Sequence, residues 1–179
     1  LVRALFGSDD HALTRILSNP HEEPEAPESA RAEARPAAVL IALVDEPIPK
    51  VLLTQRAANI RYGGHQVFPG GRIDVTDSDA RAAMFRECDE EIGLQRDRIE
   101  VLGQLADYYI HAGYRITPFV GIVRSPLSLT VPTSEVDVVT MVPLAHALDG
   151  ENYELIVRSE RPYRANYSLP FESIRIGGP

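Results

Sequence analysis

The chain has 179 residues, 44% of them apolar and 25% charged, which are the size and composition of one globular domain with a sizeable core. Its net charge of −8 argues against a nucleic-acid-binding protein, which normally carries a basic face, but leaves a phosphate-bearing substrate open if metal ions supply positive charge. The single cysteine excludes an intramolecular disulfide and a multi-cysteine zinc site, and it agrees with a reducing cytoplasm, where we expect the protein to act.

The N-terminal part of the chain predicts little packed structure. Residues 13–20 predict a short helix that ends at a proline, and residues 21–36, rich in Pro, Ala and Glu, predict a linker or long loop. No signal-peptide pattern opens the chain, and the longest apolar run, residues 37–44, is far shorter than the ~20 residues of a membrane span. We therefore divide the chain into an N-terminal helix and linker, 1–36, and one domain, 37–179.

Strand-like runs dominate the domain. Residues 37–44 and 50–56 predict a hairpin, and residues 99–110 and 114–125 predict a further pair joined through residues 111–113. Later strands are predicted at 136–144, 153–158 and 163–169, with a short helical piece at 145–150. Strands in both directions around one strong central helix indicate an α+β sandwich.

That central helix is predicted over residues 78–92. Thr76, Asp77 and Ser78 have side chains that can cap its start, and Gly93 suits the position after its end. At about 100° per residue, its apolar side chains form one compact stripe that we expect to face the core: Met84, Phe85, Cys88 and Ile92. A cysteine on this stripe is expected to be buried and chemically inert.

A second side of the same helix is acidic. Glu87, Glu90 and Glu91 fall within an arc of about 100°, whereas Asp89 points elsewhere. Carboxylates this close repel one another, and Arg86, which can pair with Glu90, cannot balance all three. A hard divalent cation, which takes oxygen ligands, would neutralise the cluster, and a solvated acidic face is the alternative interpretation.

The segment Phe68-Pro69-Gly70-Gly71-Arg72 stands shortly before this helix. Gly70 and Gly71 can take backbone conformations closed to other residues, so the segment can approach a phosphate or offer a carbonyl to a metal. Pro-Gly-Gly is by itself only a turn signal. Its position before a carboxylate-lined helix favours a binding role.

Residues 86–94, Arg-Glu-Cys-Asp-Glu-Glu-Ile-Gly-Leu, resemble the second half of the Nudix hydrolase box at every defined position. The first half departs from the box, because one extra residue lies between Gly71 and Arg86, and Asp74 and Asp77 supply the acidic residues there. This form is similar to that of the coenzyme A pyrophosphatase subgroup.

The upstream segment strengthens the resemblance to that subgroup. Residues 52–71, LLTQRAANIRYGGHQVFPGG, resemble its signature, keeping Arg56, Ala57, Arg61 and the final FPGG. The segment is one residue short between Arg61 and Gly64.

The resemblance implies a Nudix-type α/β/α sandwich with a mixed β-sheet, and a diphosphatase that depends on Mg²⁺ or Mn²⁺. The implied substrate is a small nucleotide diphosphate, with coenzyme A, split into 4′-phosphopantetheine and adenosine 3′,5′-bisphosphate, as the favoured one. Alternatives are ADP-ribose, NADH or another nucleoside diphosphate derivative. An inactive nucleotide-sensing module is the alternative of another class. A homodimer is one candidate assembly, and neither nucleic acid nor a membrane is an expected partner.

The resemblance also implies roles for individual residues. Glu87 and Glu91 are the first expected metal ligands, Glu90 is the third, and the carbonyl of Gly71 is a further candidate. Arg86 is expected to orient the glutamates through ion pairs.

The general base must be a group within reach of a metal-bound water. Glu135, in a predicted loop before an apolar strand, is the first candidate and Asp137 the second, with an ordinary surface carboxylate as the alternative for Glu135.

Cationic donors are expected around the phosphates of the substrate. Arg56, Arg61 and Arg72 are the candidates, together with the backbone of Gly70 and Gly71. Four other polar residues are expected to have structural roles, in a loop or in strand packing: His65, Tyr108, Tyr109 and Tyr114.

Overall fold

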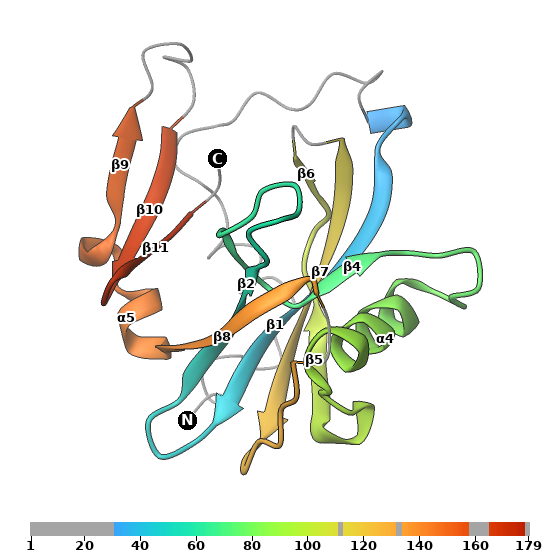
Figure 1. Ribbon diagram of the computed structural model, residues 1–179, viewed down its shortest axis with the longest axis horizontal. Coiled ribbons are helices and arrows are strands. Elements are labelled where there is room, and N and C mark those ends of the chain that lie inside the picture. The colour runs from blue at the N-terminus through green and yellow to red at the C-terminus, as the bar shows by residue number, and fades with distance from the viewer. Residues whose placement is uncertain (1–30, 111–112, 132–133, 158–164, 178–179) are drawn as a thin grey trace.

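A computed structural model describes residues 31–110, 113–131, 134–157 and 165–177 (Figure 1). The predicted first hairpin is confirmed: β1 (Arg35–Asp45) and β2 (Lys50–Arg56) pair antiparallel, with Ala42 opposite Leu52. β1 begins two residues before the predicted domain boundary, so part of the expected linker belongs to the sheet. The helix expected at 13–20 and residues 21–30 lie outside the described residues.

The main sheet is built around β1. Its path is β3-β2-β1-β7-β5, with β4 also paired to β1, β6 to β7 and β8 to β2. β1 and β7 run parallel, whereas the other pairs are antiparallel, so the sheet is mixed as expected. The remaining strands of this sheet are β3 (Gln66–Val67), β4 (Gly70–Arg72), β5 (Ile99–Gln104), β6 (Tyr108–Ile110), β7 (Tyr114–Arg124) and β8 (Val136–Pro143).

α4 (Ala80–Ile92) covers one face of this sheet (Figure 1). The predicted apolar stripe is confirmed, because Met84, Phe85, Cys88 and Ile92 are all buried in one core cluster with Leu40 and Leu52 of the sheet. Gly93 ends the helix in the left-handed conformation, with φ of 66°, and its N–H donates to the last carbonyls.

The predicted start of α4 was wrong by two residues. Asp79 caps the helix, and its side chain accepts the N–H of Ala82 at 2.7 Å. Asp77, one of the three cap candidates, is instead committed to Arg86 across the loop, at 2.9 and 3.0 Å. The cap is thus Asp79, outside the three candidates, while the Asp77 carboxylate bonds Arg86 and the N–H of Asp74.

The other face of the sheet carries a second core cluster. α5 (Leu144–Leu148) and a small three-stranded sheet, order β11-β10-β9, bring Leu144, Phe171 and Ile176 against the main sheet. Its strands are β9 (Glu154–Val157), β10 (Ala165–Phe171) and β11 (Ile174–Ile176), and short 3₁₀ turns lie at Arg96–Arg98 and Gly150–Asn152. The result is a layered α+β fold, as expected. Among the described residues, no helix is long and apolar enough to cross a membrane.

Candidate active site

β4 fixes two glycines beside α4. Gly70 pairs with Val39 and Gly71 with Ala38 of β1. Gly70 has φ of 139°, and a Cβ there would lie 2.3 Å from the carbonyl oxygen of Ala38, so no other residue fits without moving the backbone.

Two glutamates of α4 lie against these glycines. The carboxylate of Glu87 touches Gly71 so closely that a Cβ there would lie 2.4 to 2.6 Å from its atoms. Glu91 accepts the N–H of Gly70 through Oε2 at 3.1 Å. Gly70, Gly71, Glu87 and Glu91 together form what we call the glycine–glutamate centre, in which the two expected metal ligands meet the predicted glycine turn.

The negative charge of this centre is only partly compensated. Burial raises the pKa of Glu91 to about 7, and the charges of Glu87 and Glu135 add to the shift, while the Gly70 N–H and Arg56 oppose it. Burial also raises the pKa of Glu87, against the opposing effect of Arg86. Two carboxylates whose ionisation is disfavoured in this way are oxygen donors of the type that a hard divalent cation takes.

The third expected ligand is placed differently. Glu90 is exposed, and its Oε2 accepts from Nη1 of Arg86 at 3.0 Å. Within the described ranges, no three His, Cys, Asp or Glu side chains are already arranged as a metal-ligand set. Glu87 and Glu91 fit a divalent cation only with further oxygens, which backbone carbonyls, water or the substrate's own phosphates can supply.

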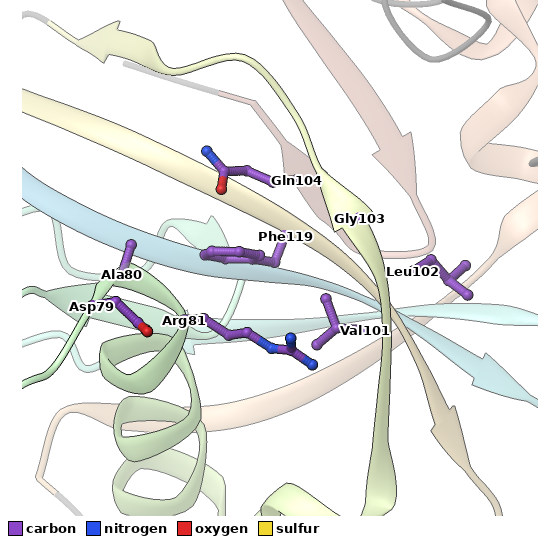
Figure 2. A pocket seen from close by; sticks show the side chains of 8 residues that line it. All are labelled: Asp79, Ala80, Arg81, Val101, Leu102, Gly103, Gln104 and Phe119. Carbon is purple, nitrogen blue, oxygen red and sulfur yellow. The ribbon is translucent and has the colours of Figure 1, made fainter. Parts of the chain in front are cut away.

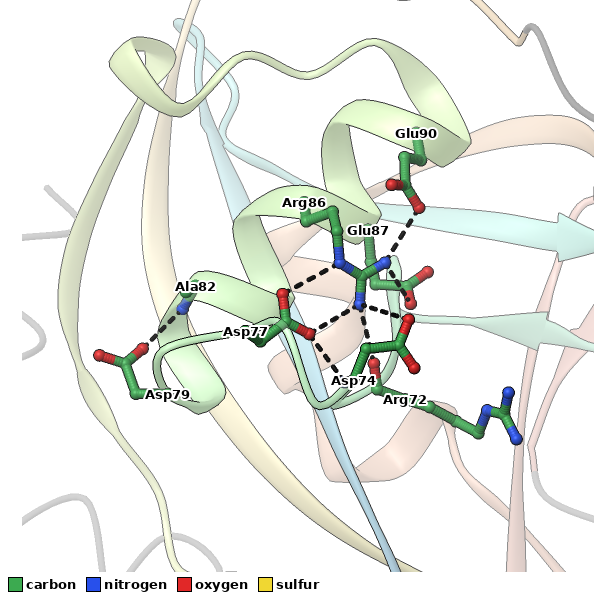
Figure 3. A network of polar contacts seen from close by, with 8 residues as sticks. All are labelled: Arg72, Asp74, Asp77, Asp79, Ala82, Arg86, Glu87 and Glu90. Atoms are coloured by element: carbon green, nitrogen blue, oxygen red, sulfur yellow. Dashed lines mark hydrogen bonds and ion pairs between the residues drawn. The ribbon is translucent and has the colours of Figure 1, made fainter.

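Arg86 holds the network that surrounds the centre (Figure 3). Its guanidinium donates to both carboxylate oxygens of Asp77, to Glu87 at 3.0 Å and to the backbone carbonyl of Arg72 at 3.0 Å. The pKa of Asp77 is lowered chiefly by this hydrogen-bonded pair, and the pKa of Arg86 is raised by the same partner. Arg86 therefore ties the helix to the β4 segment and to the loop that joins them.

The ion pair between Asp77 and Arg86 could not be predicted from their spacing in the sequence. Asp77 lies nine residues before Arg86, beyond the reach of pairs within one helix, and only the path of the loop brings the two together.

The candidate phosphate-binding arginines separate into two groups. Arg56, at the end of β2, is close enough to the centre to lower the pKa of Glu91. Arg61 instead has a local partner, since its Nη2 donates to the hydroxyl of Tyr62 at 3.0 Å and its guanidinium lies 4.9 Å from that ring. Arg72 is exposed, and Figure 3 shows its guanidinium directed away from Arg86.

The two candidate bases also differ. Glu135 is exposed, its carbonyl accepts the N–H of Ala57 at 2.8 Å, and its charge raises the pKa of both Glu87 and Glu91. Asp137 instead accepts the N–H of Ala58 at 3.1 Å and so fastens the loop after β2. Of the two carboxylates, Glu135 is the one electrostatically coupled to the centre.

The residues expected to be structural have local partners. His65 Nδ1 lies 2.9 Å from the carbonyl oxygen of Tyr62. The thiol of Cys88 is buried 4.0 Å from the sulfur of Met84, and burial raises its pKa, which agrees with an inert role.

A cavity of about 510 Å³ lies on the other flank of α4 (Figure 2). It is bounded by Asp79, Ala80 and Arg81 of the helix, by β5, and by Phe119. None of its lining residues belongs to the glycine–glutamate centre, so its size alone does not make it part of the candidate active site.

Comparisons with known proteins give the family of the chain. The NUDIX domain family model matches residues 34–162. A protein of Photorhabdus laumondii named as the uncharacterized Nudix hydrolase NudL is 37% identical over 139 residues, which are 77% of this chain and 74% of that protein. The Escherichia coli K12 protein of the same name is 44% identical over 120 residues, which are 66% of this chain and 62% of that protein.

Solved structures share the fold at low sequence identity. An Ap4A hydrolase of Caenorhabditis elegans superimposes with a TM-score of 0.55 and 19% identity over 63% of this chain and 83% of its own. The NUDIX domain of Shewanella oneidensis NrtR, solved with ADP-ribose, gives a TM-score of 0.51 and 22% identity over 69% of this chain and 82% of its own. These two likenesses concern the fold alone.

Proposed function

The chain belongs to the Nudix hydrolase family, and from this premise we propose that it is a metal-dependent diphosphatase that hydrolyses coenzyme A. Water adds across the diphosphate, one P–O bond breaks, and the products are 4′-phosphopantetheine and adenosine 3′,5′-bisphosphate. The coarser activity, hydrolysis of a diphosphate bond in a nucleoside diphosphate derivative, follows from the family.

The observation that carries the proposal is the pair of carboxylates of the half-buried Glu87 and the buried Glu91, against the backbone of Gly70 and Gly71. A divalent cation bound there would polarise the phosphoryl oxygens and lower the pKa of a coordinated water. Glu87 and Glu91 would hold it, and the absence of a side chain at Gly71 leaves the space that the Glu87 carboxylate occupies.

The remaining residues position and move protons. Arg86 keeps Glu87 in place, because its Nη1 donates to that carboxylate while Asp77 holds the rest of the guanidinium. Glu90 shares the same nitrogen and so belongs to the positioning network as well as to the candidate ligands. Glu135 would accept the proton of the attacking water, since it is an exposed carboxylate whose charge acts on both Glu87 and Glu91.

The preference for coenzyme A rests on the segment before the glycines. Arg56 lies close to the centre, where a cation would meet a substrate phosphate. The pairing of Arg61 with Tyr62, in a signature one residue short, favours the second candidate, a Nudix activity on ADP-ribose or NADH. Coenzyme A, ADP-ribose and NADH share the diphosphate and differ in the groups attached to it, so the residues around those groups would decide between them.

The test is phosphate-ester release from coenzyme A, ADP-ribose and NADH side by side, each with Mg²⁺, with Mn²⁺ and with chelator. We expect chelator-sensitive cleavage that is fastest for coenzyme A. Faster cleavage of ADP-ribose or NADH would keep the diphosphatase and reject the coenzyme A assignment. Absence of turnover with all three would favour the nucleotide-sensing module.

A matched pair of variants separates chemistry from folding. Glu87→Gln should lower kcat by at least about a hundredfold while keeping stability equal or higher, because it removes a half-buried, partly compensated charge. Asp89→Asn, on the same helix but exposed and bonded to Gln95, should keep full activity. Unfolding of Glu87→Gln would instead favour a structural role for the carboxylate.

A further inference from the structure

Arginine and tyrosine side chains line the sheet face that points away from α4, beginning next to the glycine–glutamate centre. Gly71 faces α4, since the Glu87 carboxylate fills the place of its side chain. Because successive residues of a strand point to opposite faces, Arg72 points to the other face, together with its β1 partner Ala37.

The strand register shows which residues of β7 and β6 lie on this same face. Ala37 pairs with Ile116 of β7, and Ile116 pairs with Tyr108 of β6. Tyr108 is therefore on the same face as Arg72, three strands away, and at ~4.8 Å per strand the two backbones are about 14 Å apart. Tyr108 is 52% exposed, so a ligand can reach it at this end of the face.

Arg35 and Tyr114 occupy the next position along the same face. They are register partners of β1 and β7, two residues before Ala37 and Ile116 respectively. The guanidinium of Arg35 lies 4.2 Å from the centre of the Tyr114 ring, and the backbone N–H of Arg35 donates to the carbonyl of Gly113 at 2.9 Å. Stacking on the ring holds the guanidinium plane in place, so less side-chain entropy is lost when it binds a phosphate.

Arg35 lies near Arg72, which directly follows the glycine–glutamate centre in β4. Arg35 and Arg72 are diagonal neighbours on β1 and β4, so their Cβ atoms are about 7–8 Å apart. Among the described strands, β4 pairs with β1 alone, and its other edge faces side chains of α4, since the Gly70 N–H donates to Glu91 and the Arg72 carbonyl accepts from Arg86. Arg72 follows Gly71 directly and Arg35 is its diagonal neighbour, so a substrate whose diphosphate lies at Glu87 and Glu91 would meet Arg72 first and Arg35 next.

We propose that Arg35, stacked on Tyr114, is a specificity-determining residue that binds a phosphate monoester of the substrate distant from the diphosphate that is cleaved. The proposal rests on the proposed function. In coenzyme A the group in question is the 3′-phosphate on the ribose, and an arginine fork suits a phosphate monoester through two parallel N–H donors. Arg72 would lie between this phosphate and the diphosphate.

The experiment compares two substrates that differ by that phosphate alone, coenzyme A and 3′-dephospho-coenzyme A. In Arg35→Gln, KM for coenzyme A should rise about ten- to hundredfold, as expected when a charge-assisted hydrogen bond is lost, with a smaller change in kcat. The preference of the wild type for the 3′-phosphate should disappear. Tyr114→Leu should lower the preference severalfold, and Tyr114→Phe should keep it, because the ring remains.

A control variant on β7, the strand of Tyr114, tests whether loss of any arginine charge has the same effect. Arg124 lies at the far end of β7, is exposed, and reaches Glu100 only at 3.9 Å. Arg124→Gln should therefore leave the ratio of the two KM values as in the wild type. An equal rise of KM for both substrates in Arg35→Gln, or no rise for either, would overturn the proposal.

Calorimetry of ligand binding tests the phosphate site at Arg35 separately from the proposed hydrolysis of coenzyme A. If the wild type hydrolyses neither substrate, the coenzyme A assignment fails, but the binding of adenosine 3′,5′-bisphosphate and of adenosine 5′-monophosphate still measures the subsite. The bisphosphate should bind at least about tenfold more tightly, and Arg35→Gln should remove the difference. Equal affinities in the wild type would reject a phosphate site at Arg35.

Discussion

Glu87 and Glu91 are the residues at which charge and burial conflict most sharply. Glu91 is 6% exposed. Gly70 and Arg56 both lower its pKa, but only the Gly70 N–H makes a direct hydrogen bond to it. A carboxylate buried with so little compensation lowers the stability of its charged form. The pair is therefore expected to be better suited to binding a cation than to stabilising the apoprotein.

This conflict predicts how stability depends on pH. With chelator present, Glu91 is protonated in both states below pH 4.5, and between 4.5 and about 7 it is protonated only in the folded state. The unfolded state then binds fewer protons, so the free energy of unfolding should fall as pH rises through this window, by up to roughly 3 kcal/mol. Urea unfolding of the wild type and of Glu91→Gln at several pH values measures it. The same slope in both proteins would contradict the assignment.

Asp77 and Asp74 are a matched pair of acids beside Arg86. The Asp77 side chain is 6% exposed and bonds Arg86 through both oxygens, whereas Asp74 is 56% exposed and lies 3.9 Å away. Asp77→Asn should lower the free energy of unfolding by about 1–3 kcal/mol and reduce kcat, because Glu87 loses its orientation. Asp74→Asn should change stability by less than about 0.5 kcal/mol. Equal effects in thermal unfolding would argue against a special role for Asp77.

At the scale of elements, the site depends on how closely β4 approaches both β1 and α4. The strand is only three residues long, yet its two glycines face different neighbours. Gly70 is crowded by the backbone of Ala38 and Val39, which cannot move without disturbing β1, and Gly71 is crowded by the flexible side chain of Glu87. One glycine is thus required by the backbone of β1 and the other by the position of the Glu87 carboxylate.

The two glycines should separate folding from activity. Gly70→Ala forces a side chain into φ of 139° and into a contact with a carbonyl oxygen, so it should destabilise the protein by roughly 2–4 kcal/mol. Gly71→Ala should remain folded but lose about a hundredfold or more in kcat, because Glu87 is displaced. Thermal unfolding and kinetics on the same samples check both. The reverse pattern would mean that β4 carries its strain at Gly71.

At the scale of the whole molecule, the net charge of −8 means that cations can stabilise the fold in two ways, by screening and by specific binding. Mn²⁺ or Mg²⁺ at about 100 times its Kd should stabilise the wild type by about 2.7 kcal/mol, which raises the Tm by several degrees. Chelator should reverse the rise. The rise in Tm should be lost in Glu87→Gln, and NaCl at matched ionic strength should not reproduce it. An equal rise in Tm with NaCl would indicate screening alone.

What the sequence determined by itself is the structure that is encoded within a few turns of chain. The first hairpin, the apolar stripe of α4 and the end of the helix at Gly93 follow from local periodicity and turn chemistry, and all three were predicted. The grouping of Glu87 and Glu91 on one flank was predicted for the same reason, because helical geometry fixes side-chain direction over four residues.

Only the tertiary structure decided which distant groups meet. It assigned Asp77 to Arg86 and the cap to Asp79, and it placed Arg56 near Glu91 and the Arg61 guanidinium against Tyr62. It also aligned four side chains on one face: Arg72, Arg35, Tyr114 and Tyr108. These choices depend on the path of a loop and on the register between strands far apart in sequence. A shift of one residue in that register would turn each side chain to the opposite face, and local spacing carries no information about it.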